Sequence, residues 1–130
     1  MSEAFVLDAS AVLCLLKGEK GTDRVIEVLP RSFISAVNLS EVYAKLADAG
    51  GSEEKIAHAV GVLHLKVEPF DDDQCRDAGM LRPATKPLGL SMGDRACLAL
   101  ARRRIATALT TDRIWTEVQE TLNIRVELLR

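Results

Sequence analysis

Short apolar runs alternate along this chain with longer segments in which apolar residues recur at about every third or fourth position. The short runs predict strands, and the longer segments predict amphipathic helices. The strands are expected at residues 4–8, 32–36, 65–70, 106–111 and 124–128. The helices are expected at residues 10–17, 21–29, 38–49, 53–64, 72–82 and 92–104, with a short one near 113–120 and a loop over 83–90.

Strands that alternate with helices are typical of a parallel sheet with helices on both faces. No repeat, linker or low-complexity stretch divides the 130 residues. A chain of this length is long enough to bury one hydrophobic core. We therefore expect a single α/β domain over residues 1–130.

The composition is that of a folded globular domain, with 48% hydrophobic and 28% charged residues. No apolar run reaches the roughly 20 residues needed to cross a bilayer. The start of the chain, Met1-Ser2-Glu3, lacks the basic segment and apolar core of a secretory signal. A cytoplasmic location without membrane contact is the expectation, while the net charge of −2 does not decide for or against nucleic acid.

Three cysteines are widely spaced and form no C-x-x-C pair. Zinc and redox roles therefore have little support. Cys14 and Cys97 lie in apolar helical stretches, where a buried thiol behaves as a small hydrophobic residue.

Four acidic residues stand where apolar segments meet a turn or a helix. Asp8 follows Phe5-Val6-Leu7, and Asp112 follows the run 106–111, so both fall at the carboxyl ends of predicted strands. In an open parallel sheet, ligands bind at that edge. Glu41 and Asp94 lie near the starts of two predicted helices that can line the same edge.

Carboxylates gathered in one place repel each other and raise each other's pKa unless a positive charge lies among them. A hard divalent cation with oxygen ligands, Mg²⁺ or Mn²⁺, would supply that charge. Each acid also has a purely structural interpretation. Asn38-x-x-Glu41 and Ser91-x-x-Asp94 have the spacing of a capping box, and Asp112 can cap the short helix after it.

The four acids lie in stretches that together resemble the PIN-domain nucleases, and most closely the VapC-type toxins of bacterial toxin–antitoxin pairs. The matching stretches, in chain order, are VLDASA from Val6, SAVNLSEV from Ser35, LSMGDRACLALA from Leu90 and LTTDRIW from Leu109. The resemblance implies a three-layer α/β/α fold with a mostly parallel, twisted sheet. It also implies a metal-dependent endoribonuclease that is held inactive by a VapB-type antitoxin, and usually a homodimer.

The resemblance assigns catalytic roles to all four acids. It implies that Asp8, Asp94 and Asp112 are ligands of Mg²⁺ or Mn²⁺, directly or through water. Glu41 would complete the pocket as a ligand, or by positioning and deprotonating the attacking water. The RNA that is cleaved is left open.

Five neighbouring residues are further candidates. The hydroxyls of Ser10 and Thr111 can reach the metal-bound water or the phosphate, or can form capping and turn bonds. Asn38 can orient Glu41 or cap its helix. Arg95 and Arg113 each follow one of the acids and can contact RNA phosphates, or can be solvated helix residues.

Two other functions remain open. One is a PIN-like interaction module without catalytic activity. The other is a phosphatase or phosphotransfer domain with an aspartyl nucleophile after the first strand, although Ser10 stands where such phosphatases carry a second acid. Replacing Asp8 or Asp94 separates these alternatives from the nuclease.

Overall fold

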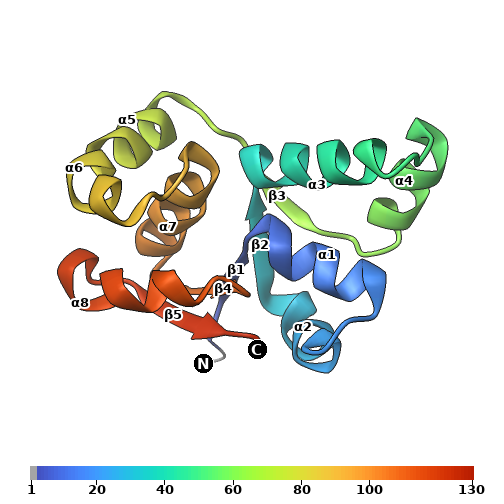
Figure 1. The fold of residues 1–130 in the computed structure, drawn as a ribbon, viewed down its shortest axis with the longest axis horizontal. Helices are drawn as coiled ribbons and strands as arrows, with labels where there is room; N and C mark the ends of the chain where they lie inside the picture. Colours follow the sequence, from blue (N-terminus) through green and yellow to red (C-terminus); the bar gives the residue numbers. More distant parts are fainter. Residues whose placement is uncertain (1–2) are drawn as a thin grey trace.

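The computed structural model describes residues 3–130 and contains one parallel sheet with helices on both faces (Figure 1). The strands are β1 (Phe5–Leu7), β2 (Ser32–Ser35), β3 (Lys66–Glu68), β4 (Thr107–Thr110) and β5 (Arg125–Leu128). Their order is β3-β2-β1-β4-β5, and every neighbouring pair is parallel. The expected α/β/α fold is confirmed.

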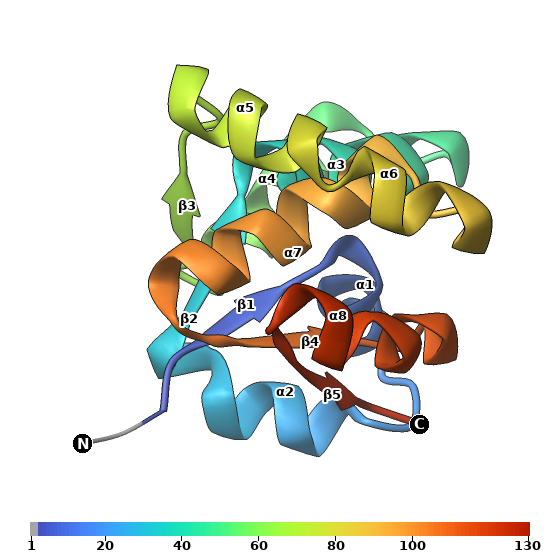
Figure 2. The ribbon, with the colours of Figure 1, turned by 90° about the vertical axis from the view of Figure 1, so that its left-hand side faces the viewer.

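One face of the sheet carries α1 (Ala9–Lys17), α2 (Thr22–Val28), α3 (Ala36–Asp48) and α4 (Glu53–Gly61). The other carries α5 (Asp72–Met80), α6 (Arg82–Thr85), α7 (Met92–Arg104) and α8 (Gln119–Leu122). Figure 2 shows this second layer in front of the strands. Three 3-10 segments, η1 (Leu29–Arg31), η2 (Lys86–Leu88) and η3 (Arg113–Val118), lie between these elements.

Two hydrophobic clusters fill the spaces between the layers. Val6 and Ala108 face the cluster under α7, which also contains the fully buried Trp115. Phe5, Leu7 and Leu109 face the cluster under α1 to α4. The central strand β1 thus alternates its side chains between two cores, which explains why Phe5-Val6-Leu7 contains no polar residue.

The order of the strands creates a crevice between β1 and β4. From β1 the chain builds outward through β2 to β3 on the α1–α4 side. It then crosses to the other face through α5 to α7 and returns beside β1 as β4. Because the direction of building reverses between β1 and β4, the connections leave that point on opposite faces, and ligands bind in such crevices.

Two details differ from the sequence-based expectation. The predicted loop 83–90 contains α6 and η2. Pro83 and Pro87 each lie in the first turn, where proline is tolerated because its missing N–H has no helical partner there. In addition, α3 begins at Ala36 and is capped by Ser35, whose side chain accepts from the Val37 amide, so Asn38 is not the cap.

Candidate functional site

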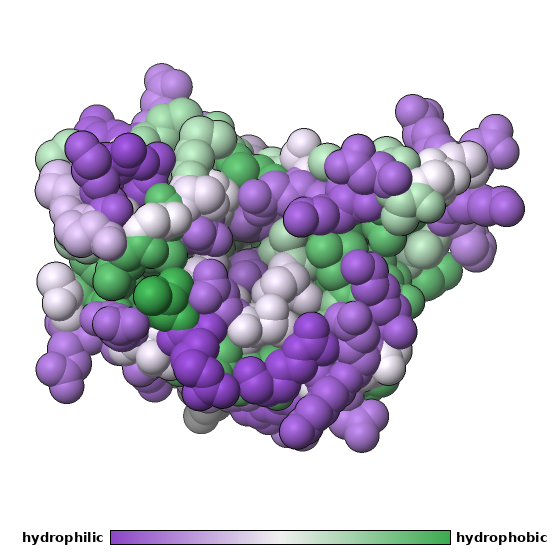
Figure 3. Space-filling model, in the orientation of Figure 1, coloured by the Kyte–Doolittle hydropathy of each residue, from purple (hydrophilic) through white to green (hydrophobic). Residues whose placement is uncertain are grey.

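The four acidic residues line a single cavity at the carboxyl edge of the sheet. Its volume is about 570 Å³, and its walls come from α1, from α3, from the start of α7 and from the residues that follow β1 and β4. The lining residues are Asp8, Ala9, Ser10, Leu13, Lys17, Asn38, Glu41, Lys45, Asp94, Thr111 and Asp112. The space-filling view is hollowed at the centre of the same face, with hydrophilic residues around the hollow (Figure 3).

Asp8 is the buried floor of the cavity, with 6% of its surface exposed. Its Oδ1 accepts hydrogen bonds from the Ala11 amide at 2.9 Å and from Ser10 Oγ at 2.6 Å. Its Oδ2 accepts from Thr110 Oγ1 at 2.6 Å. Asp8 therefore caps α1 and is tied to β4 at the same time, so its carboxylate is fixed at the crevice.

Burial raises the pKa of Asp8 to about 6, and the nearby Asp94 charge adds to the increase. The three hydrogen bonds act in the opposite direction, because they favour the ionised carboxylate. No basic side chain in residues 3–130 forms an ion pair with Asp8, so its charge has no direct partner there.

Glu41 reaches the cavity from the second turn of α3. Asn38 Nδ2 donates to Glu41 Oε1 at 2.9 Å and to the Gly93 carbonyl oxygen at 3.0 Å. Since both partners are acceptors, the amide nitrogen of Asn38 must face them. Gly93 has no side chain to obstruct the carboxylate: a Cβ there would lie 2.6 Å from Glu41 Cδ. Asn38 and Gly93 together hold Glu41 against α7.

Asp94 lies in the first turn of α7 and forms the capping box that its spacing predicts. Ser91 Oγ accepts from the Asp94 amide at 3.1 Å, and Asp94 Oδ2 accepts from the Ser91 amide at 2.8 Å. This bond restrains the carboxylate at the rim. Asp94 therefore caps α7 and also lines the cavity.

Asp112 is exposed and lies two residues beyond the end of β4. Its Oδ1 accepts from the Ile114 amide at 3.1 Å and so caps η3, as its position predicts. Its own amide donates to Thr110 Oγ1 at 3.0 Å. The threonine hydroxyl thereby links the backbone of Asp112 to the side chain of Asp8.

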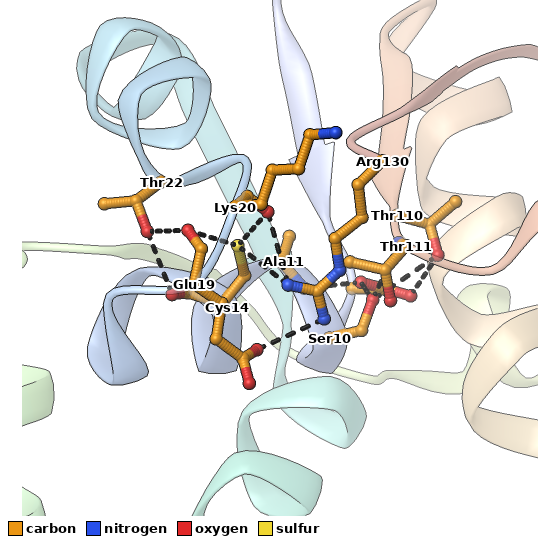
Figure 4. Close-up of polar contacts among 10 residues, drawn as sticks. Ser10, Ala11, Cys14, Glu19, Lys20, Thr22, Thr110, Thr111 and Arg130 are labelled. Atoms are coloured by element: carbon orange, nitrogen blue, oxygen red, sulfur yellow. Dashed lines mark hydrogen bonds and ion pairs between the residues drawn. The ribbon is translucent and has the colours of Figure 1, made fainter.

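Ser10 and Thr111 join the two strand ends. Ser10 Oγ donates to Asp8 and accepts from the Thr111 amide at 3.0 Å, so the backbone of Thr111 makes this contact (Figure 4). Thr110, which sequence reasoning passed over in favour of its neighbour, has the more central hydroxyl. Two adjacent threonines at a strand end give no sequence signal for the choice. The strand register decides which threonine contacts Asp8: the pairing of Leu7 with Leu109 places Asp8 beside Thr110.

The two arginine candidates do not line the cavity. Arg95 is turned toward α5, where Nη1 donates to the Ala78 carbonyl oxygen at 3.1 Å, so the expected phosphate contact at this site is not supported. Arg113 is exposed on η3. Sequence reasoning did not single out the two cations that do line the cavity, Lys17 and Lys45.

Two other charged stretches are accounted for by local structure. Asp71 caps α5, since its Oδ1 accepts from the Gln74 amide at 3.0 Å. In the run 102–104, Arg103 pairs with Asp77 at 3.1 Å, and Arg104 pairs with Glu68. Asp71 thus serves as a helix cap, and the two arginines link the end of α7 to α5 and β3.

The donor set of the cavity fits a hard divalent cation that keeps most of its waters. Among residues 3–130, no three Asp, Glu, His or Cys side chains are close enough together to hold one ion directly. Mg²⁺ usually binds through one or two carboxylates and retains water for its other positions. Asp8 and Asp94, whose charges already influence each other, are the pair best placed for such binding.

Comparison with known proteins identifies the family. The PIN-domain family model matches residues 5–120. The chain belongs to the PIN-domain family. No curated protein matches it by sequence. In the part of this PIN domain that the structure describes, no helix is long and apolar enough to cross a membrane.

Solved structures share the fold of this PIN domain at low sequence identity. The DNA-bound VapBC of Salmonella typhimurium is 22% identical, with a TM-score of 0.75 over 99% of this chain and 100% of that one. A toxin–antitoxin complex from Klebsiella pneumoniae is 16% identical, with a TM-score of 0.76 over 98% of both chains. VapC20 of Mycobacterium tuberculosis, described as a sarcin-ricin loop cleaving toxin, is 18% identical, with a TM-score of 0.74 over 88% of this chain and 95% of that one.

Proposed function

We propose that this PIN domain is a Mg²⁺- or Mn²⁺-dependent endoribonuclease and acts as the toxin of a toxin–antitoxin pair. The observation that carries the proposal is that acidic residues from four separate segments line one cavity at the β1/β4 crevice. The raised pKa of Asp8 further supports the proposal, because a bound cation would stabilise the ionised form of this buried carboxylate. The solved VapBC and VapC20 structures of the same fold make RNA the substrate to test first.

Asp8 and Asp94 would be the principal ligands of the ion, and Asp112 would join them through water. When bound, the ion lowers the pKa of coordinated water and stabilises charge that develops on the phosphate. Ser10 and Thr110 keep both oxygens of Asp8 in place. The Asp8 carboxylate is thus held in place by contacts within the protein.

Glu41 is the proposed acceptor of the proton from the attacking water. Asn38 occupies Oε1, so the carboxylate cannot rotate freely, and Oε2 is the oxygen that takes the proton. The water oxygen forms a bond to phosphorus while the bond from phosphorus to the 3′ oxygen breaks. The products are a 5′-phosphate and a 3′-hydroxyl, because the 2′-hydroxyl does not attack.

The test is to sequence RNA ends after expression of the wild-type, Asp8→Asn and Asp94→Asn proteins. Wild-type protein should produce new 5′-phosphate ends and arrest growth, whereas both variants should remain folded and produce neither. Cleavage that survives both substitutions in metal-depleted buffer contradicts the proposal. If the wild-type protein with added Mg²⁺ or Mn²⁺ never cleaves RNA, the inactive interaction module is favoured.

The partner proposals have separate tests. A VapB-type antitoxin should be encoded by a small reading frame directly beside this one, and it should co-purify with the PIN domain and suppress cleavage. The proposed homodimer should appear at twice the 14.2 kDa chain mass in light scattering. We also propose that residues 1–130 form a single domain. Antitoxin binding and dimerisation are proposed to take place in the cytoplasm.

A further inference from the structure

Two lysines line the outer part of the acidic cavity on the α1 and α3 side. Lys17 is the last residue of α1, and Lys45 lies one turn beyond Glu41 on α3. Both are exposed. Leu13, one turn before Lys17, lines the same wall. On both helices, therefore, the lining residues near the strands form the inner end of the cavity, and a lysine lies at its outer end.

Glu41 and Lys45 have the i, i+4 spacing that normally brings opposite charges together on a helix. Here Asn38 and the Gly93 backbone hold the Glu41 side chain instead. Neither Lys45 nor Lys17 forms an ion pair with a carboxylate anywhere in residues 3–130. Two ammonium groups thus remain free at the edge of a cavity that contains four acids.

The separation of charge along the cavity matches the needs of a polyanion strand. The reacting phosphate has to lie at the acids, where a bound cation offsets their charge. Phosphates next to it have no such cation and need basic side chains. Lys17 and Lys45 are the only basic residues among those that line the cavity, and Lys45 lies four residues beyond Glu41, about 6 Å along the helix axis.

We propose that Lys17 and Lys45 form a phosphate-binding subsite for the RNA strand on one side of the cleaved bond. The strand then leaves the acidic cavity between the ends of α1 and α3, away from η3 and Arg113. This inference rests on the proposed nuclease function. It adds the direction of the strand and two residues that contact its backbone.

The experiment measures binding of a single-stranded RNA oligonucleotide to the Asp94→Asn protein by fluorescence anisotropy at several salt concentrations, with a chelator present. Each lysine that neutralises a phosphate should contribute about 0.7 to the slope of log affinity against log salt concentration. The Lys17→Ala/Lys45→Ala pair should therefore lower that slope by about 1.4. Lys17→Arg/Lys45→Arg should restore it.

The matched control is Lys55→Ala/Lys86→Ala, which removes the same charge from exposed positions outside the cavity. Its slope should stay at the parent value. An equal reduction in both pairs would mean that only net charge matters, and no reduction in the Lys17/Lys45 pair would mean that these residues do not contact phosphate. Either result overturns the subsite.

A purely structural role for the two lysines is separately measurable. Both lie in the last turn of their helices, where a cation stabilises the helix by about 0.3–1 kcal/mol. If the alanine pair lowered the free energy of unfolding and left the salt slope intact, the lysines would be helix-end residues only. Binding does not require cleavage, so these outcomes differ from a failure of the nuclease assignment, which the wild-type cleavage assay detects.

Discussion

Thr110 Oγ1 donates a hydrogen bond to Asp8 Oδ2 at 2.6 Å, across 102 positions of sequence. The same hydroxyl accepts from the Asp112 amide. Asp8 is buried and ionisable, so this contact connects the stability of the fold with the proposed chemistry of the site.

Thr110→Val should destabilise the protein and impair RNA cleavage. It leaves Asp8 Oδ2 without its donor and the Asp112 amide without its acceptor, and a hydrogen bond to a charged group contributes about 1.5–3 kcal/mol. Thr110→Ser keeps the hydroxyl and should recover most of the loss. Urea denaturation and a cleavage assay measure the two effects. A valine variant with wild-type stability and activity would show that the contact is unimportant.

Asp8→Asn should stabilise the metal-free protein at neutral pH. Because the pKa of Asp8 is raised from 3.8 to about 6, the native chain binds more protons at this site than the unfolded chain between these values. The free energy of unfolding therefore falls as the pH rises through this interval, and the full cost of about 1–3 kcal/mol is present above pH 6.

The comparison of Asp8→Asn with wild type uses denaturation in chelator near pH 4 and near pH 7.5. The variant should gain stability over wild type only at the higher pH. Adding Mg²⁺ should then stabilise wild type more than the variant. If the stability difference between the variant and wild type is the same at both pH values, burial does not penalise the Asp8 charge.

Gly93→Ala should reduce cleavage by about tenfold or more if Glu41 is the proton acceptor. The new Cβ would meet the Glu41 carboxylate and displace it from Asn38. Alanine is otherwise the better helix residue by up to about 1 kcal/mol.

The sign of the Gly93→Ala effect on stability should depend on Glu41. In a Glu41→Ala background the clash is removed, so Gly93→Ala should raise the free energy of unfolding. A double-mutant cycle by chemical denaturation measures this coupling. Additive effects would mean that Gly93 and Glu41 do not interact in solution.

One of the three cysteines should react with a thiol reagent in the native protein. Cys75 is exposed, whereas Cys14 and Cys97 are buried. Burial raises the pKa of Cys97 well above its ordinary value, and the charges of Asp8, Asp94 and Glu41 add to this, so its reactive thiolate is suppressed. Thiol titration should count one group before denaturation and three after, and Cys75→Ser should abolish the native reaction. A native count above one would contradict the burial of the other two.

The sequence predicted the class of fold because the central strand β1 is an apolar run between two cores, and helices such as α3 carry their apolar residues at helical spacing. The helices in 83–90 were missed because their prolines, which break a helix interior, occupy first turns. The start of α3 was misplaced because Ser35 was assigned to the preceding strand and Asn38 was given its capping role.

The presence of the four acids in one cavity could be anticipated, because the carboxyl ends of parallel strands meet at one edge. The contacts that these acids make with their neighbours could not be anticipated. Whether Thr110 or Thr111 faces Asp8 depends on strand register, and the direction of Arg95 depends on how α5 packs on α7. No sequence signal separates Lys17 and Lys45 from other surface lysines. The packing of α1 with α3 brings them to the cavity.

The adjacency of β1 and β4 also affects how the protein is made. Asp8 is synthesised about a hundred residues before its neighbours Thr110 and Asp112. Such distant pairings are slow to form. A polypeptide that stops short of Thr110 cannot assemble the cavity, so any activity of this site begins only after β4 has been made and has paired with β1.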